Sequence, residues 1–171
     1  WLHAVSTNQW YEWLWRDPDL NTLHRHRSNC HVVFNEEHLV GDWQTGNVYA
    51  LDMDNYTDNN VPILRQRTTQ TLQKEQRYQF FSSLQVDMQT GVGITSGQGS
   101  DPKLMLRFSD DGGHSWSNIK ETTIGRTGQY SARARFTRLG KGRNRVWEIT
   151  RTDPVKFAVF GAYCDYKPGA Y

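Results

Sequence analysis

The sequence is poor in cysteine, in long apolar runs and in helical periodicity. Its two cysteines, Cys30 and Cys164, lie far apart and match no zinc or redox spacing, so we expect two separate thiols, with a disulfide as the open alternative. No apolar run approaches the about 20 residues that span a bilayer, and no basic start followed by a short apolar stretch marks a signal peptide. These absences argue against a zinc module and a membrane segment. The sequence begins at Trp1 rather than Met, and we interpret it as part of a longer protein.

Charge is unevenly distributed along the chain. Residues 103–156 hold 12 Lys and Arg against 5 Asp and Glu, a net +7, whereas the remaining residues hold 8 against 13, a net −5. Hydrophobic residues make up only 36% of the chain, although seven Trp supply large side chains for burial. We therefore expect a folded protein whose apolar surface is partly completed by neighbours. The charge asymmetry is compatible with binding to an acidic partner or nucleic acid, although exposed Arg on solvated strands is the commoner cause of such a pattern.

Short runs that alternate apolar and polar residues predict an all-β protein. In residues 1–54 the candidate strands span residues 10–15, 30–35, 38–44 and 47–53, with a tight hairpin turn at Thr45 and Gly46. Four strands with Trp and Tyr anchors are typical of one β-propeller blade, which would bury the Trp residues. The sequence thus predicts a propeller-blade-like unit at residues 1–54.

A polar segment rich in turn formers, residues 55–62, predicts a linker that ends at Pro62. Residues 63–171 then form a C-terminal domain that is similar to a β-sandwich. Its candidate strands span residues 63–71, 78–88, 103–109, 119–125, 130–139, 145–152 and 155–166. The Gly-rich segment 90–102 lacks a phosphate-binding register, and we interpret it as a connection or assembly loop.

The stretch "SDDGGHSWSN" matches the Asp-box pattern of sialidases and other β-propeller proteins. The matching residues are Ser109, Asp111, Gly113, Ser115 and Trp116. In this hairpin turn the aspartate accepts backbone hydrogen bonds, Gly113 takes a positive φ and Trp116 packs beneath. These roles are structural, so we expect a brace for one hairpin within the C-terminal domain.

Catalysis is not expected. A sialidase needs an arginine cluster, a Tyr paired with Glu and an Asp acid from many blades, which this chain is too short to assemble. No G-x-S-x-G elbow occurs, and we interpret the neighbouring carboxylates Asp110 and Asp111 as solvated turn residues. A carbohydrate-binding or sialidase-like propeller that contacts host glycans through Trp10, Trp13 and Trp15 is the alternative function, and a general propeller interaction module is a third.

Histidines gather near the first unit but predict no metal site. They are His24, His26, His31 and His38, with Cys30 beside His31. Their spacing differs from that of zinc ligands, so polar loop histidines are the better interpretation. We expect no metal and no cofactor.

A basic cluster in the second half is the best candidate for a binding surface. It comprises Arg133, Arg135, Arg138, Lys141, Arg143 and Arg145. Arg133 and Arg135 alternate along a predicted strand and therefore share a face. The cluster predicts either a solvated hairpin or an interface with acidic protein or phosphate.

Taken together, three segments resemble a known family. "GVGITSGQGSDPKLMLRFSDDGGHSWSN", "GRTGQYSARARFTRLGKGRNRVWEI" and "TDPVKFAVFGA" are similar in order and spacing to packaged-DNA stabilisation proteins, the tail nozzle or tail hub proteins of short-tailed bacteriophages. Upstream, "RHRSNCHVVFNEEHLVGDWQTGNVYALD" resembles the last propeller blade of that family. The chain looks like the C-terminal part of such a protein.

The resemblance implies a non-enzymatic structural protein of the virion, present in the host cytoplasm during assembly. It implies a ring of copies, usually six, beneath the portal and adaptor proteins, through which packaged DNA passes. It also implies contacts with tailspike, tail fibre or needle proteins. The family offers no catalytic residue, metal or cofactor to assign to this chain.

Overall fold

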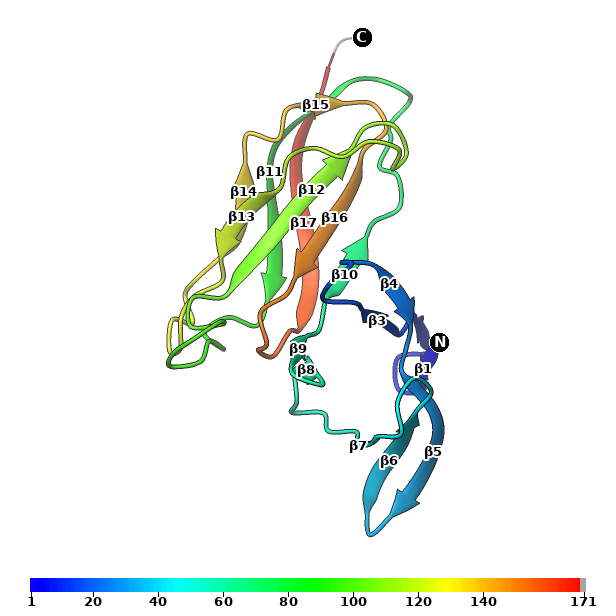
Figure 1. Ribbon diagram of the computed structural model, residues 1–171. Coiled ribbons are helices and arrows are strands. Elements are labelled where there is room, and N and C mark those ends of the chain that lie inside the picture. Colours follow the sequence, from blue (N-terminus) through cyan, green and yellow to red (C-terminus); the bar gives the residue numbers. More distant parts are fainter. Residues whose placement is uncertain (170–171) are drawn as a thin grey trace. The chain divides into compact units, whose positions relative to one another are not determined.

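The computed structural model describes residues 1–169 and contains strands but no helix (Figure 1). This confirms the all-β fold class. Accordingly, the described residues hold no helix of the length and apolar character that crossing a bilayer requires. The chain divides into two compact units, residues 1–63 and residues 64–171.

The first unit is built from nine short strands. They are β1 (Leu2–Ala4), β2 (Gln9–Tyr11), β3 (Leu14–Arg16), β4 (Leu23–Arg25), β5 (Ser28–Phe34), β6 (Glu37–Asp42), β7 (Val48–Ala50), β8 (Thr57–Asp58) and β9 (Val61–Pro62). They form the separate hairpins β1-β2, β3-β4 and β8-β9, and the three-stranded sheet β5-β6-β7. All pairings are antiparallel.

The prediction of a single four-stranded blade is wrong for this unit. The predicted strand at residues 10–15 is split between β2 and β3, whose partners are β1 and β4 rather than one common sheet. Strands of two or three residues bury little apolar area, so each hairpin pairs locally. The predicted linker 55–62 contains the hairpin β8-β9. The predicted hairpin around Thr45 and Gly46 is confirmed, since β6 and β7 pair, but residues 43–47 connect the two strands in place of a tight two-residue turn.

A single ion pair organises the three-stranded sheet of the first unit. Both Nε and Nη2 of Arg27 donate to Asp42 Oδ2, at 2.8 and 2.6 Å. Asp42 also accepts hydrogen bonds from the Gln44 amide and the Thr45 hydroxyl, so it shapes the β6-β7 turn. The Arg27 hydrogen bonds hold the pKa of Asp42 well below its usual range. Polar contacts organise this sheet because Val40 is the only buried hydrophobic residue in this unit of the described chain.

The second unit is a two-sheet sandwich with a conventional apolar core. Its strands are β10 (Arg65–Thr68), β11 (Gln79–Met88), β12 (Lys103–Ser109), β13 (Lys120–Thr123), β14 (Ala134–Thr137), β15 (Lys141–Gly142), β16 (Val146–Arg151) and β17 (Val159–Pro168). One sheet has the order β10-β16-β12-β13. In the other, β11 pairs with β14 and β15 and also with the long strand β17.

Alternation along β11 and β12 supplies the core between the two sheets. Leu84, Val86 and Met88 of β11 point inward, as do Leu104 and Leu106 of β12, because side chains two residues apart share a face. Trp147 of β16 packs edge-on against Phe81 and Phe108. Figure 1 shows β12 and β16 lying across β11 and β17. The predicted β-sandwich of the C-terminal domain therefore has its core in these residues.

Candidate functional site

The turn that follows β12 is organised around the Asp111 carboxylate. Its Oδ1 accepts hydrogen bonds from the Ser109 hydroxyl at 2.6 Å and the Ser115 amide at 2.9 Å, and its Oδ2 accepts one from the Ser115 hydroxyl at 2.5 Å. The Ser109 hydroxyl in turn accepts the Gly113 amide at 2.8 Å. These bonds favour the ionised carboxylate, so the pKa of Asp111 lies well below its usual range. Asp111 is thus occupied in closing its own turn.

Gly113 and Trp116 complete this turn. Gly113 has a φ of 101°, a region that only glycine adopts without strain. Trp116 is half-buried, and the guanidinium carbon of Arg107 lies 4.5 Å from the centre of its ring. Arg107 also forms an ion pair with the buried Glu148 of β16. A cation between an aromatic ring and a carboxylate therefore links the turn to the sheet.

The φ of Gly113 leads to a stability prediction. Gly113→Ala is expected to destabilise the second unit by about 1–2 kcal/mol, because alanine is strained at this φ. Gly161→Ala of the same unit is the control, since Gly161 has no positive φ and the place that its Cβ would occupy lies no closer than 3.8 Å to another atom. Urea denaturation of both variants makes the comparison, and equal midpoints would show that the turn tolerates a side chain.

The predicted basic cluster does not form one exposed surface. Arg133, Arg135, Arg138, Lys141 and Arg143 are exposed, but Arg145 is only 1% exposed. Counting Arg145 among residues of a binding surface is therefore wrong. Its guanidinium carbon lies 4.0, 4.5 and 5.1 Å from the ring centres of Phe108, Phe81 and Trp147. Arg145 is a core residue that aromatic rings enclose.

Asp110 is the partner that allows Arg145 to be buried. Arg145 Nε donates to Asp110 Oδ1 and Arg145 Nη2 to Asp110 Oδ2, both at 2.7 Å. Arg145 Nη1 donates to the Leu139 carbonyl at 2.5 Å. A side chain at Gly142 would collide with Asp110 Oδ1, so a glycine there leaves room for the carboxylate. Asp110 is an exposed turn residue, as interpreted, but its pairing with Arg145 also joins the turn after β12 to the start of β16.

Three of the five exposed members of the cluster contact other side chains, in two different places. Lys141 and Arg143 both lie over the ring of Tyr78, at 4.9 and 4.3 Å from its centre. Arg135 lies on the outer face of the β14-β11-β17 sheet and donates to the Ser83 hydroxyl at 3.2 Å. The sequence contained no signal that Tyr78 contacts these two basic residues, since Tyr78 is 63 residues from Lys141.

Two histidines of the first unit pair with each other, and the others lie against Trp rings. His31 Nε2 lies 2.9 Å from His38 Nδ1, and their rings are stacked. His24 lies against Trp15 and bonds to the Thr22 hydroxyl. Among residues 1–169, no group of three or more His, Cys, Asp or Glu is placed to hold a metal ion. Cys30 and Cys164 are free thiols.

His26 makes the first unit sensitive to acid. Its Nδ1 accepts the Ser28 amide at 3.2 Å and pairs with the Ser28 hydroxyl at 2.7 Å, while its ring lies 4.8 Å from that of Trp13. Burial lowers the pKa of His26 below 6.5. The unfolded chain then binds the proton more tightly, so the stability that this histidine contributes is present above pH 6.5 and is lost as the pH falls through its folded pKa.

We expect acidification below pH 6.5 to reduce the thermal stability of the first unit, and His26→Gln to weaken that dependence. The imidazole titration measured by NMR provides the direct check. A folded-state pKa for His26 at or above 6.5 would contradict the expectation.

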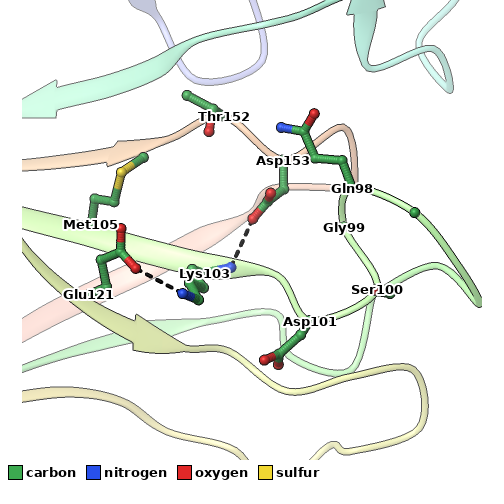
Figure 2. Close-up of a pocket in the computed structure, with 10 residues that line it drawn as sticks. Gln98, Gly99, Ser100, Asp101, Lys103, Met105, Glu121, Thr152 and Asp153 are labelled. Carbon is green, nitrogen blue, oxygen red and sulfur yellow. Dashed lines mark hydrogen bonds and ion pairs between the residues drawn. The ribbon is translucent and has the colours of Figure 1, made fainter.

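A hollow of about 330 Å³ lies beside the start of β12 (Figure 2). Figure 2 shows Lys103 between two carboxylates: its amide donates to Asp153 Oδ2 at 2.8 Å and its ammonium to Glu121 Oε2 at 2.9 Å. Asp101 at the rim accepts the Thr123 hydroxyl at 2.8 Å. The loop 97–101 forms one wall, which assigns part of the Gly-rich segment to this hollow. Each of these charged groups thus has a partner, and Lys103 and Glu121 form an ion pair with each other.

The Trp residues considered for glycan contact differ in exposure. Trp10 is 64% and Trp13 40% exposed, so their expected burial in a blade is wrong, whereas Trp15 is half-buried beneath the Arg27 guanidinium at 4.9 Å. Trp10 and Trp13 each pair with a histidine, His3 and His26. The three rings therefore do not form one stacking platform on a common sheet.

Comparison with known proteins identifies the second unit. A family model described as "Bacteriophage P22 Gp10, beta-sandwich" matches residues 64–167, more than half of the chain. The match begins at the first residue of the second unit and includes both sheets of the sandwich. Curated proteins give no match.

Proposed function

This chain belongs to the bacteriophage P22 Gp10 β-sandwich family, a family of phage structural proteins, and on that basis we propose that it is the tail nozzle or hub protein of a short-tailed phage. In this role, copies form a ring, six by analogy with the resembling family, below the portal and adaptor proteins. The ring retains packaged DNA and anchors tailspike, tail fibre or needle proteins. The match over residues 64–167 is the observation that carries the proposal.

The charge of the two units supports an assembly role. Residues 1–63 hold 3 Lys and Arg against 9 Asp and Glu, a net −6, while residues 64–171 hold 17 against 9, a net +8. Opposite charges on two surfaces favour contacts between different faces of neighbouring copies, which is the arrangement that closes a ring. The exposed basic residues Arg138, Lys141 and Arg143 are then available to an acidic protein or to phosphate.

The turn after β12 and the hairpins of the first unit each have a role in this proposal. We assign the turn of Ser109, Asp111, Gly113, Ser115 and Trp116 to bracing as an Asp-box, with no contact to substrate. As part of the proposal, the complete protein contains a β-propeller. The short hairpins of residues 1–63 form one edge of that propeller rather than a full blade. The net negative charge of the first unit supports an edge position that a neighbouring element covers.

The proposal is tested in phage particles. A phage that lacks the protein should package DNA and then lose it, and its particles should lack the tail, as judged by electron microscopy and by the DNA content of purified heads. Complementation with the wild-type protein should restore both. Tails that assemble normally without the protein would overturn the proposal.

A further inference from the structure

Strand β17 has a free edge of unusual length. It is ten residues long, and β11 is its partner along one side. No other strand of the described residues pairs with it. An edge of this length presents a row of backbone N–H and C=O groups to any incoming strand. Natural proteins protect such edges with charge, proline or a covering element.

Lys167 and Pro168 protect only the C-terminal end of β17, and the rest of its edge lacks such protection. Its first seven residues, 159–165, carry a single charge, Asp165. Phe160 is 72% and Tyr163 67% exposed. Tyr163 lies in one cross-strand row with Gln85 and Arg135 on the outer face of the sheet. A free edge with exposed aromatic residues is typical of a surface that pairs with a strand of another chain.

Strand β5 of the first unit also has a free edge and exposed apolar side chains, so it could pair with β17. It lies at the edge of the sheet β5-β6-β7, and β6 is its strand partner in the described chain. Val32, Val33 and Phe34 are 57%, 56% and 69% exposed, so both faces of this strand present apolar side chains to solvent. An edge strand with two apolar faces is stable only when something covers it.

Charge favours β5 as the strand that adds to β17. Glu36 in the turn between β5 and β6 and Glu37 at the start of β6 are both exposed. Lys156 and Lys167 flank the two ends of the exposed part of β17, and Arg135 lies on the same sheet. Two copies of β17 meeting each other would instead bring two basic units together. The opposite charges therefore favour a contact between β5 of one copy and β17 of another over a contact between two copies of β17.

We propose that β5 of one copy of the chain adds to the free edge of β17 in the next copy, which extends the β14-β11-β17 sheet across the interface. The proposal rests on the proposed function in one respect: a head-to-tail contact of this kind closes a ring. It identifies the partner as a second copy of the same chain and names the strand that it contributes. The main-chain hydrogen bonds supply affinity, and Phe160 and Tyr163 supply apolar contacts.

Cysteine cross-linking provides the test, because Cys30 lies in β5 and is exposed. In the full protein carrying Cys164→Ser, which removes the neighbouring native thiol, Tyr163→Cys is oxidised mildly, and linked species are separated without reductant and mapped by mass spectrometry. Paired strands bring opposite Cα atoms to about 4.5–5.5 Å, within the range of a disulfide. We expect an intermolecular disulfide between Cys30 and the thiol introduced at position 163, which disappears when Cys30→Ser is added. Phe160→Cys and Asp165→Cys cover neighbouring registers and replace Tyr163→Cys should it fail to fold.

Two controls make the outcome decisive. Tyr130→Cys, at a 76% exposed aromatic residue outside the strands, should give no link to Cys30. Tyr163→Lys should lose assembly into rings, as measured by sedimentation, while Tyr130→Lys should keep it. Links between the introduced thiols of two Tyr163→Cys copies, or normal assembly of Tyr163→Lys, would overturn the proposal.

The two proposals fail in different ways. A protein absent from purified tails would refute the tail function, but the purified protein would still report the Cys30 link. Conversely, tails that contain the protein but show no link from Cys30 to any of the three positions in β17 would refute the strand pairing alone.

Discussion

Arg145→Ala is expected to destabilise the β-sandwich by about 2–5 kcal/mol, the range typical of removing a large buried side chain and leaving a cavity. The guanidinium is 1% exposed, makes two hydrogen bonds to Asp110 and lies among three aromatic rings. Its removal leaves a cavity between the rings and a carboxylate without its partner. Urea denaturation followed by the NMR signals of Leu104 and Leu106 measures the loss, since both residues are fully buried in the core of the sandwich.

Arg143→Ala is the matched control for this prediction. Arg143 is two residues away and exposed, and its contact with the Tyr78 ring contributes about 0.5–1 kcal/mol at a surface site. A substitution at Arg145 therefore acts on the fold, whereas a substitution at Arg143 acts on the surface. A charge reversal at Arg143 can accordingly test assembly without unfolding the unit. Similar unfolding midpoints for the two alanine variants would show that the Asp110–Arg145 pair does not support the core.

Arg151→Met is expected to stabilise the second unit by about 1–3 kcal/mol, because buried donors without partners cost about that much each. Arg151 is fully buried, and its Nη1 donates to the Lys156 carbonyl at 3.1 Å. Its Nε and Nη2 find no acceptor among the described residues. Burial lowers the pKa of Arg151 to about 10, which expresses the same cost of holding its charge away from water. Methionine keeps much of the side-chain length and removes the charge.

Arg151 and Arg145 differ in the partner of the guanidinium. Both are buried, but the Nε and Nη2 edge that binds Asp110 in Arg145 has no carboxylate in Arg151. The melting temperature of Arg151→Met, measured beside the wild type and Arg145→Met, checks the opposite signs. A loss of stability in Arg151→Met as large as that in Arg145→Met would mean that the Arg151 charge has a stabilising partner.

Local pattern was sufficient to predict several elements of the fold. β12 occupies residues 103–109 as predicted, since apolar residues at alternate positions between Pro102 and the Asp-Asp-Gly-Gly turn mark both its face and its ends. The hairpin at Thr45 and Gly46 is likewise encoded by adjacent residues. By contrast, residues 130–133 alternate like a strand but lie outside β14, because only Ala134–Thr137 finds a partner in β11.

The sequence by itself determined that the chain is all-β, that its second half is basic, and, through the resemblance, that it is a phage structural protein. Only the tertiary structure decided which charges are available for binding. Arg143 and Arg145 are neighbours of the same kind in sequence, but Asp110, 35 residues away, makes one of them a core residue. Burial of a charge depends on a partner brought close by folding, and spacing along the chain does not encode that distance.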